Sequence, residues 1–203
     1  KNEQVSSLAD LAGKKVFSAG KGTTPQYVLE YLLAENRVEA QVEYLAEASE
    51  VAARLAAEDA AVAVLPEPYV TTVLASDPSL QAALDLTAEW DKVSPTTLVT
   101  GVLVVADDFA EQNGAAFDAF LEEYRDSIEY TNANPAEVAP LIADLGIVPS
   151  PEVAQAAIPR SHLAFLGGAE CKAAVSAYLD VLFQADPGSV GGALPDEAFY
   201  YGA

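Results

Sequence analysis

The stretch KVFSAGKGTTPQYVLEYLL (Lys15–Leu33) decides the fold of this chain. Its first five residues form a short β-type run, and apolar residues at helical spacing begin soon after the glycine-rich turn. Glycines in such a turn adopt backbone conformations that are closed to other residues. A strand, a glycine-rich turn and a helix in this order are the first half of a βαβ unit. We therefore predict a strand at Lys15–Ala19 and a helix at about Thr24–Glu35.

The same alternation continues as far as Leu65. Gln41–Leu45 is predicted to be the second strand, EASEVAARLAAED (Glu47–Asp59) a helix, and the apolar run that ends at Leu65 a third strand. Strands separated by helices at this spacing need crossover connections, which produce a parallel sheet. The first half of the chain is thus predicted to be α/β.

Most of the remaining chain is predicted to be helical. A short helix is expected at residues 69–75, after the PEP turn, and two more strands are expected at Ala82–Leu86 and Gly101–Val105. Helical patterns follow at residues 115–132, 135–146, 151–158 and 169–185.

The composition limits the classes of partner. Acidic residues number 31 against 10 basic ones, which gives a net charge of -21 and argues against nucleic acid and anionic membranes, since both repel an acidic surface. Cys171 and His162 are the only residues of their kinds, so no disulfide framework and no zinc site of histidines and cysteines is expected. An all-carboxylate calcium site stays open. We predict no metal and no cofactor.

The loop after the first strand is the first candidate site. Thr23 or Thr24 caps the helix: with Thr23 as the cap Gln26 completes a capping box, and with Thr24 as the cap Pro25 takes the first helical position. Either cap leaves several amide N–H groups and the positive end of the helix dipole at the carboxyl edge of the sheet. Such a loop suits an anionic or polar group.

Two catalytic interpretations of this loop fail on spacing or context. A phosphate loop needs G-x-x-x-x-G-K-[ST], whereas Lys21 lies between the two glycines. Ser18 and Lys21 match S-x-x-K, but the S-D-N and K-T-G partners of penicilloyl-type serine enzymes do not accompany them.

Several phrases of the sequence resemble extracytoplasmic solute-binding proteins of ABC importers. Residues 7–33 look like the entry into the second lobe of that family, with its D-L-x-G-K-x-[IV] phrase. Residues 61–75, 101–113 and 127–142 resemble later phrases in the same order. The branch that the chain most resembles handles nitrate, sulfonates, taurine and thiamine-pyrimidine precursors. In this chain the D-L-x-G-K-x-[IV] phrase consists of Asp10, Leu11, Gly13, Lys14 and Val16.

The resemblance implies a two-lobed α/β fold of the periplasmic-binding-protein-like type, with a parallel-core sheet in its complete lobe. Residues 9–96 would form that lobe, which is the second lobe of the family. Residues 97–203 would supply the return strand and the C-terminal helices of the first lobe. This first lobe is expected to be partial and helix-rich, because its N-terminal half is absent from the chain.

The function implied by the resemblance is transport and involves no chemistry. A small polar or anionic solute (a sulfonate, nitrate or a pyrimidine-like molecule) would bind in an interlobe cleft and pass to ABC permease subunits. The protein would be an extracytoplasmic monomer, in the periplasm or as a cell-surface lipoprotein. Two alternatives stay open, a ligand-sensing domain of a regulator and a thiamine-pyrimidine-synthesis-like enzyme on the same fold.

The resemblance also assigns residues to the ligand site. Trp90 could stack on a ring but is expected to pack between lobes, and His162 is interpreted as a turn residue, so no catalytic residue is predicted. Glu67 could accept hydrogen bonds from an amino group or could be an exposed turn carboxylate. The predicted ligand-binding residues are Gly20, Lys21, Gly22, Thr23, Thr24, Glu67 and Tyr69.

Overall fold

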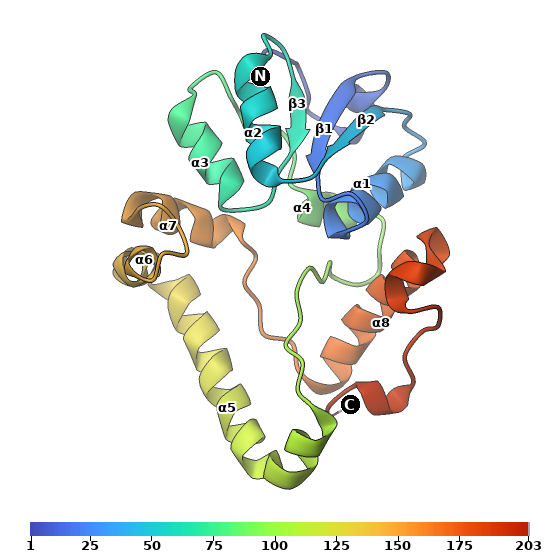
Figure 1. The fold of residues 1–203 in the computed structure, drawn as a ribbon, viewed down its shortest axis with the longest axis vertical. Coiled ribbons are helices and arrows are strands. Elements are labelled where there is room, and N and C mark those ends of the chain that lie inside the picture. Colours follow the sequence, from blue (N-terminus) through green and yellow to red (C-terminus); the bar gives the residue numbers. More distant parts are fainter. Residues whose placement is uncertain (203) are drawn as a thin grey trace. The chain divides into compact units, whose positions relative to one another are not determined.

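The computed structural model describes residues 1–202 of the chain. It divides into two compact units, and Figure 1 follows the chain through both. Unit 1 comprises Lys1–Thr100 and Gly167–Ala203, and unit 2 comprises Gly101–Leu166. A small parallel sheet with many helices confirms the predicted α/β class.

The sheet lies in unit 1 and has three strands in the order β2-β1-β3. They are β1 (Lys15–Ala19), β2 (Gln41–Leu45) and β3 (Val62–Val64), which confirms the three strands predicted up to Leu65. Both neighbours run parallel to β1, with Ser18 paired to Tyr44 on one side and to Val64 on the other.

Helices of unit 1 cover both faces of this sheet. In β1, Val16 points to one face of the sheet, where it packs in a cluster with Leu29 and Leu32 of the first helix. The next residue, Phe17, points to the opposite face and packs with Val51 of the second helix, as the period-two alternation of a strand requires. The helices of unit 1 are α1 (Thr24–Glu35), α2 (Ala48–Ala57), α3 (Tyr69–Ser76), α4 (Leu86–Trp90) and α8 (Gly168–Ala185), with 3₁₀ turns η1 (Leu8–Leu11), η3 (Pro187–Val190) and η4 (Glu197–Phe199).

Trp90 lies at the centre of the larger cluster and is fully buried. Its ring centroid is 4.8 Å from that of Tyr31 and 5.8 Å from that of Tyr178, and its indole N–H donates to the carbonyl of Thr96 at 2.8 Å. All four residues belong to unit 1. Trp90 is therefore a core residue of unit 1, and through Tyr178 it contacts the segment 97–203 that is predicted to form the other lobe.

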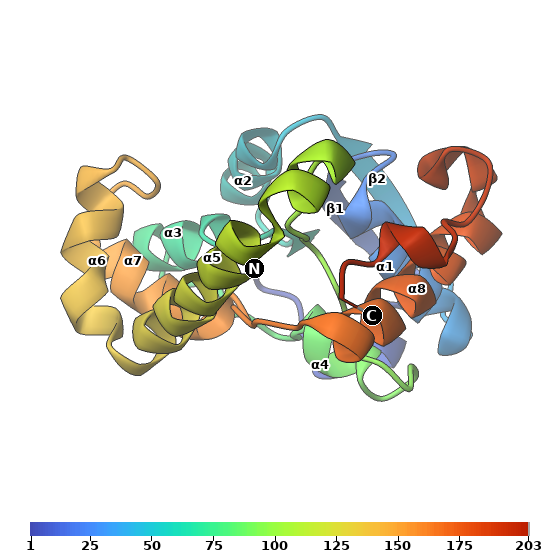
Figure 2. The same cartoon turned by 90° about the horizontal axis from the view of Figure 1, so that it is seen from below.

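Unit 2 is helical, as predicted. Its elements are α5 (Asp107–Ala133), α6 (Pro135–Asp144), α7 (Pro151–Ala157) and the 3₁₀ turn η2 (Ile158–Arg160). Figures 1 and 2 both show α6 beside α7. A proline takes the first position of each of these two helices, where its missing N–H leaves no hydrogen bond unmade.

Two predicted strands are wrong. Residues 82–85 have no regular structure, and α4 then begins at Leu86 because the Asp85 carboxylate accepts from the Thr87 amide at 2.9 Å and caps the helix. Gly101–Val105 pairs with no strand among residues 1–202. A run of β-type residues forms a ladder only when a partner strand lies beside it, and sequence propensity does not supply that partner.

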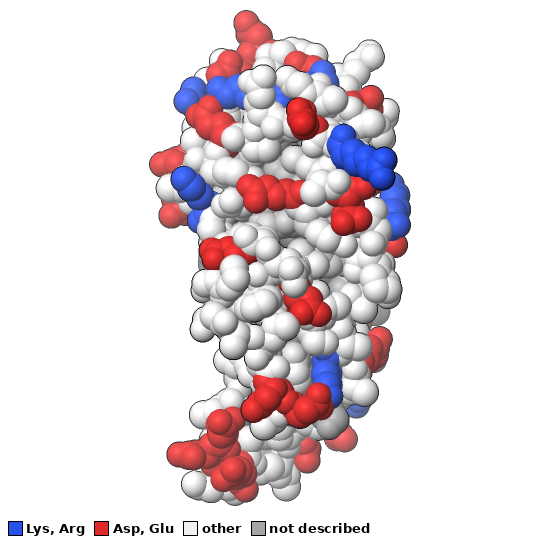
Figure 3. Space-filling model, turned by 90° about the vertical axis from the view of Figure 1, so that its right-hand side faces the viewer, with Lys and Arg blue, Asp and Glu red and all other residues white. Residues whose placement is uncertain are grey.

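Acidic side chains are spread over the face drawn in Figure 3, with fewer basic ones among them. Within residues 1–202, no helix combines the length and the apolar character needed to cross a membrane. The same residues contain no group of three or more His, Cys, Asp or Glu side chains placed to hold a metal ion.

Candidate functional site

The carboxyl edge of the sheet brings the predicted site residues to one side of unit 1. Since the three strands are parallel, the segments that leave them start from the same edge. The loop Gly20–Thr23 follows β1, and Pro66–Pro68 follows β3, the neighbour of β1 in the sheet. Open α/β sheets bind ligands at this edge.

The loop after β1 depends on its two glycines. Gly20 and Gly22 have φ angles of 77° and 76°, in the left-handed region that other residues rarely adopt. The Gly20 amide donates to the carbonyl of Leu45 at 3.2 Å, so the loop is still bonded to β2 at its first residue. The Thr23 hydroxyl donates to the carbonyl of Gly20 at 2.7 Å, which closes the turn.

Gln26 binds a different residue from the one that a capping box requires. Thr23 is the N-cap of α1, but its side chain makes no capping hydrogen bond. The Gln26 Oε1 atom instead accepts from the Gly22 amide at 2.7 Å, and its Nε2 donates to Glu30 Oε1 at 2.9 Å. The Tyr44 hydroxyl donates to the same Glu30 oxygen at 2.9 Å, and burial followed by Glu30 raises the pKa of Tyr44. A side-chain amide oxygen thus occupies the place where a ligand oxygen would bind the loop.

Fewer amide donors are free at this helix end than the sequence suggests. Those of Gly20, Gly22 and Thr23 are bonded to Leu45, to the Gln26 side chain and to Gly20 respectively. The amides of Lys21 and Thr24 have no such partner within the described part of the chain. Lys21 is exposed and makes no ion pair with another of the described residues.

Tyr178 of α8 lies behind the first turn of α1. Its side chain is buried, and its hydroxyl oxygen has no hydrogen bond of good geometry among residues 1–202. Burial raises the pKa of this phenol, and the nearby Thr24 side chain acts in the opposite direction. The Tyr27 hydroxyl, one turn further along α1, donates to Asp186 Oδ2 at 3.5 Å. Sequence reasoning missed Tyr178, because no local pattern links it to a helix more than a hundred residues earlier.

Glu67 and Tyr69 have different surroundings at the same edge. The Glu67–Pro68 peptide bond is cis, and Glu67 Oε2 accepts from the Thr71 amide at 3.1 Å, which caps the first turn of α3. Tyr69 is the first residue of that helix and is 42% exposed. Glu67 therefore contributes to helix capping, whereas the Tyr69 ring is available to a ligand.

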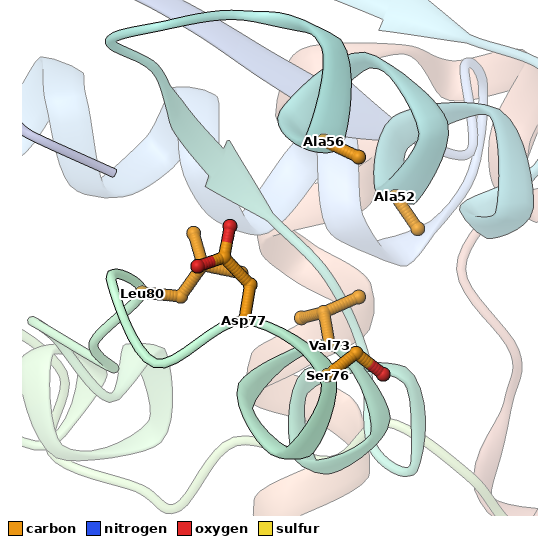
Figure 4. Close-up of a pocket in the computed structure, with 6 residues that line it drawn as sticks. All are labelled: Ala52, Ala56, Val73, Ser76, Asp77 and Leu80. Atoms are coloured by element: carbon orange, nitrogen blue, oxygen red, sulfur yellow. The ribbon is translucent and has the colours of Figure 1, made fainter.

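A separate small pocket lies between α2 and α3 (Figure 4). Its volume is about 190 Å³, below the roughly 300 Å³ at which ligand sites usually start. Its one charged residue, Asp77, accepts from the Ser79 hydroxyl and amide, which lowers the pKa of the Asp77 carboxyl. We therefore do not place the functional site there. The lining residues are Ala52, Ala56, Val73, Ser76, Asp77 and Leu80.

The two remaining reactive side chains, His162 and Cys171, belong to segments other than those that leave the carboxyl edge of the sheet. His162 is an exposed turn residue of unit 2 with a φ angle of 49°. Cys171 is half-buried in α8, and burial raises the pKa of its thiol, which favours the unreactive protonated form.

Residues 3–165 match the VitK2_biosynth family, described as menaquinone biosynthesis. Because the match spans well over half of the chain, the protein belongs to this family. A solved structure from Parabacteroides distasonis, described as an ABC transporter, is similar, with 27% identity and a TM-score of 0.75. The similarity covers 94% of this chain and 66% of that one, so the chain spans just under two thirds of its length. No curated protein matches the chain.

The family match overturns the solute-binding interpretation. The expected transport function, the ABC permease partner and the absence of enzymatic activity are wrong, since the family is one of biosynthesis, and the family match gives no support to a lipoprotein. The alternative of a synthesis-type enzyme fits better. Phrases such as DLAGKKV and PEP encode a strand, a turn and the start of a helix, so they identify structural elements rather than a reaction.

Proposed function

We propose that this chain is part of an enzyme of menaquinone biosynthesis and that it holds a small-molecule substrate at the carboxyl edge of its sheet. The observation that carries the proposal is the family match over residues 3–165, which contain the complete strand-loop-helix segment. The proposed binding residues are the loop Gly20–Thr24 and Tyr69. Glu67 is assigned the structural task of capping α3.

The chemistry of the loop favours a substrate with an anionic oxygen. The Lys21 ammonium, the amides of Lys21 and Thr24 and the N-terminus of α1 all attract negative charge. Menaquinone is a naphthoquinone, so its precursors are ring compounds, and the exposed Tyr69 ring offers an aromatic face for stacking. We therefore propose a carboxylated ring compound as the substrate class.

The finer architecture belongs to the same proposal. We keep the two-lobed periplasmic-binding-protein-like fold as a hypothesis, with residues 9–96 as the complete lobe and residues 97–203 as the partial one. An extracytoplasmic location also stays a prediction, which cell fractionation would test.

Isothermal titration calorimetry with 1-naphthoate tests the binding site, and the neutral 1-naphthalenemethanol serves as the control ligand. We expect binding of the carboxylate only, and a loss of roughly tenfold in affinity for Lys21→Ala, equivalent to about 1.4 kcal/mol. Lys92→Ala is the matched control, because Lys92 is an exposed lysine of unit 1 that pairs with Glu89. Equal affinities in the two variants would remove Lys21 from the site.

A second experiment tests the pathway. The gene for the complete protein is expressed in a menaquinone-requiring strain that lacks its own family member. Growth without added menaquinone is expected with the wild-type gene and the Lys92→Ala gene. Failure of the wild-type gene to restore growth would contradict the proposed pathway, whatever the binding data show.

A further inference from the structure

Three side chains of unit 1 form a chain of hydrogen bonds that ends on the loop after β1. The Tyr44 hydroxyl of β2 and Gln26 Nε2 both donate to Glu30 Oε1, each at 2.9 Å. Gln26 Oε1 accepts from the Gly22 amide at 2.7 Å. Gly22, Gln26 and Glu30 follow one another at intervals of four residues. Because side chains of a helix point back toward its N-terminus, each of the two side chains reaches the residue one turn before it. A carboxylate on α1 is thus connected to the loop in front of that helix.

The chemistry of Glu30 determines which way the Gln26 amide faces. An ionised carboxylate only accepts hydrogen bonds, so the part of Gln26 that meets it must be the NH₂ group. The Gln26 oxygen then faces the Gly22 N–H, which needs an acceptor. The reversed amide would place two donors together at Gly22 and two acceptors together at Glu30. The Tyr44 hydroxyl donates to the same carboxylate oxygen and holds it in place. Glu30 therefore fixes one of the two orientations of the Gln26 amide.

This orientation limits which ligand can use the Gly22 amide. A ligand oxygen at this amide has to take the place of Gln26 Oε1. A neutral oxygen would exchange one bond between neutral groups for another of similar strength. An anionic oxygen forms a charge-assisted bond, which is roughly twice as strong. Only an oxygen with a negative charge therefore gains by displacing Gln26.

We propose that Glu30 is a positioning residue of the substrate site and acts through Gln26. It keeps the Gly22 amide occupied until an anionic oxygen of the substrate displaces the Gln26 side chain. This role rests on the proposed function, since it requires a ligand at the Gly20–Thr24 loop. It also accounts for an exposed glutamate close to a loop that attracts anions, where a carboxylate without this role would only repel the substrate.

Amide hydrogen exchange of the complete protein without ligand, followed by NMR, is the first test. Glu30→Ala removes the acceptor of Gln26 Nε2, so the Gly22 amide should exchange a few-fold faster than in the wild type. Glu35→Ala is the matched control. Glu35 is exposed, is the last residue of the same helix and is not a member of the hydrogen-bond chain. Its replacement should leave the exchange rate of Gly22 unchanged.

The double variant Q26E/E30Q exchanges the two partners and keeps the net charge of the wild type. The carboxylate at position 26 can accept from the Gly22 amide, and the amide at position 30 can donate to that carboxylate. The Gly22 amide should therefore exchange about as slowly as in the wild type. 1-Naphthoate should bind this variant less tightly, because a negative charge then lies at the loop. A merely structural role of Glu30 predicts neither result.

Calorimetry with 1-naphthoate measures the coupling between the two side chains. The ionic strength is about 0.15 M, which screens the charge of Glu30 itself. Gln26→Ala and Glu30→Ala should each raise the affinity a few-fold. The double variant Q26A/E30A should bind no more tightly than Gln26→Ala does, since both changes free the same amide.

Two results would overturn the role of Glu30. One is a Gly22 amide that exchanges equally fast in Glu30→Ala and in the wild type. The other is a pair of affinity gains that add in Q26A/E30A, because Glu30 would then act by its charge and not through Gln26. If neither the wild type nor any variant binds 1-naphthoate, the proposed function fails instead, and the exchange rates alone decide the role of Glu30.

Discussion

The two units of the molecule differ in how well their apolar side chains are covered. Unit 1 buries both faces of its sheet, in the clusters around Trp90 and Phe17. Among the described residues, eleven of the fifteen exposed large hydrophobic side chains lie in unit 2, which is the smaller unit. Buried apolar area is the main source of stability in a folded domain. The apolar side chains of unit 1 are therefore better covered than those of unit 2.

The largest effect should come from removing the centre of the unit 1 core. Trp90→Ala deletes a fully buried ring that contacts Tyr31 and Tyr178, and should lower the free energy of unfolding by about 3–5 kcal/mol. Phe109→Ala removes an aromatic side chain of unit 2 that is 50% exposed. It should change the free energy of unfolding by no more than about 0.5 kcal/mol. Urea unfolding measures both values. Similar losses of unfolding free energy in the two variants would show that the two units do not differ in how well their apolar side chains are covered.

The next effect concerns the two glycines of the loop. A Cβ at Gly20 would lie 2.3 Å from Thr23 Oγ1, whereas one at Gly22 would meet nothing within 4 Å. Both substitutions place a side chain at positive φ, at a cost of about 1–2 kcal/mol. Gly20→Ala should therefore destabilise unit 1 more than Gly22→Ala does in thermal unfolding. The reverse order would show that the Thr23–Gly20 turn is unimportant.

A smaller effect is expected from acid. Hydrogen bonds from Ser6, first through its amide, and from Ser7 lower the pKa of Asp10 to about 2 from 3.8. Because the folded-state pKa is the lower one, this stabilisation is complete above about pH 4 and is lost as the pH falls towards 2. Asp10→Asn should remove that part of the pH dependence of the melting temperature. An unchanged pH profile in the variant would contradict the assignment.

The smallest effect should separate binding from stability. Gln26→Ala frees the Gly22 amide that now donates to Gln26 Oε1, so a ligand oxygen no longer has to displace a side chain. We expect 1-naphthoate to bind a few-fold more tightly, with the free energy of unfolding lowered by about 1 kcal/mol at most. Calorimetry and urea unfolding give the two quantities. Weaker binding would mean that Gln26 itself contacts the ligand.

The same contrast explains what the sequence could predict. Local patterns predicted β1 and α1 because a strand, two glycines and a capped helix lie within twenty residues of each other. The position of Tyr178 beside the first turn of α1 depends on packing between α8 and α1, and no local sequence pattern predicts this contact. Gly101–Val105 has strand composition but pairs with no strand among residues 1–202, so propensity alone gave a wrong element there. The phrases that suggested transport follow the scaffold and do not specify its chemistry.

The most direct test of the central claim follows the backbone amides of residues 1–203 by NMR during titration with 1-naphthoate. If the substrate binds at the carboxyl edge of the sheet, the largest shifts should come from the Lys21 and Thr24 amides, with smaller ones at Gly22 and Tyr69. Shifts confined to residues outside the Gly20–Thr24 loop, or no shifts at saturating ligand, would contradict it.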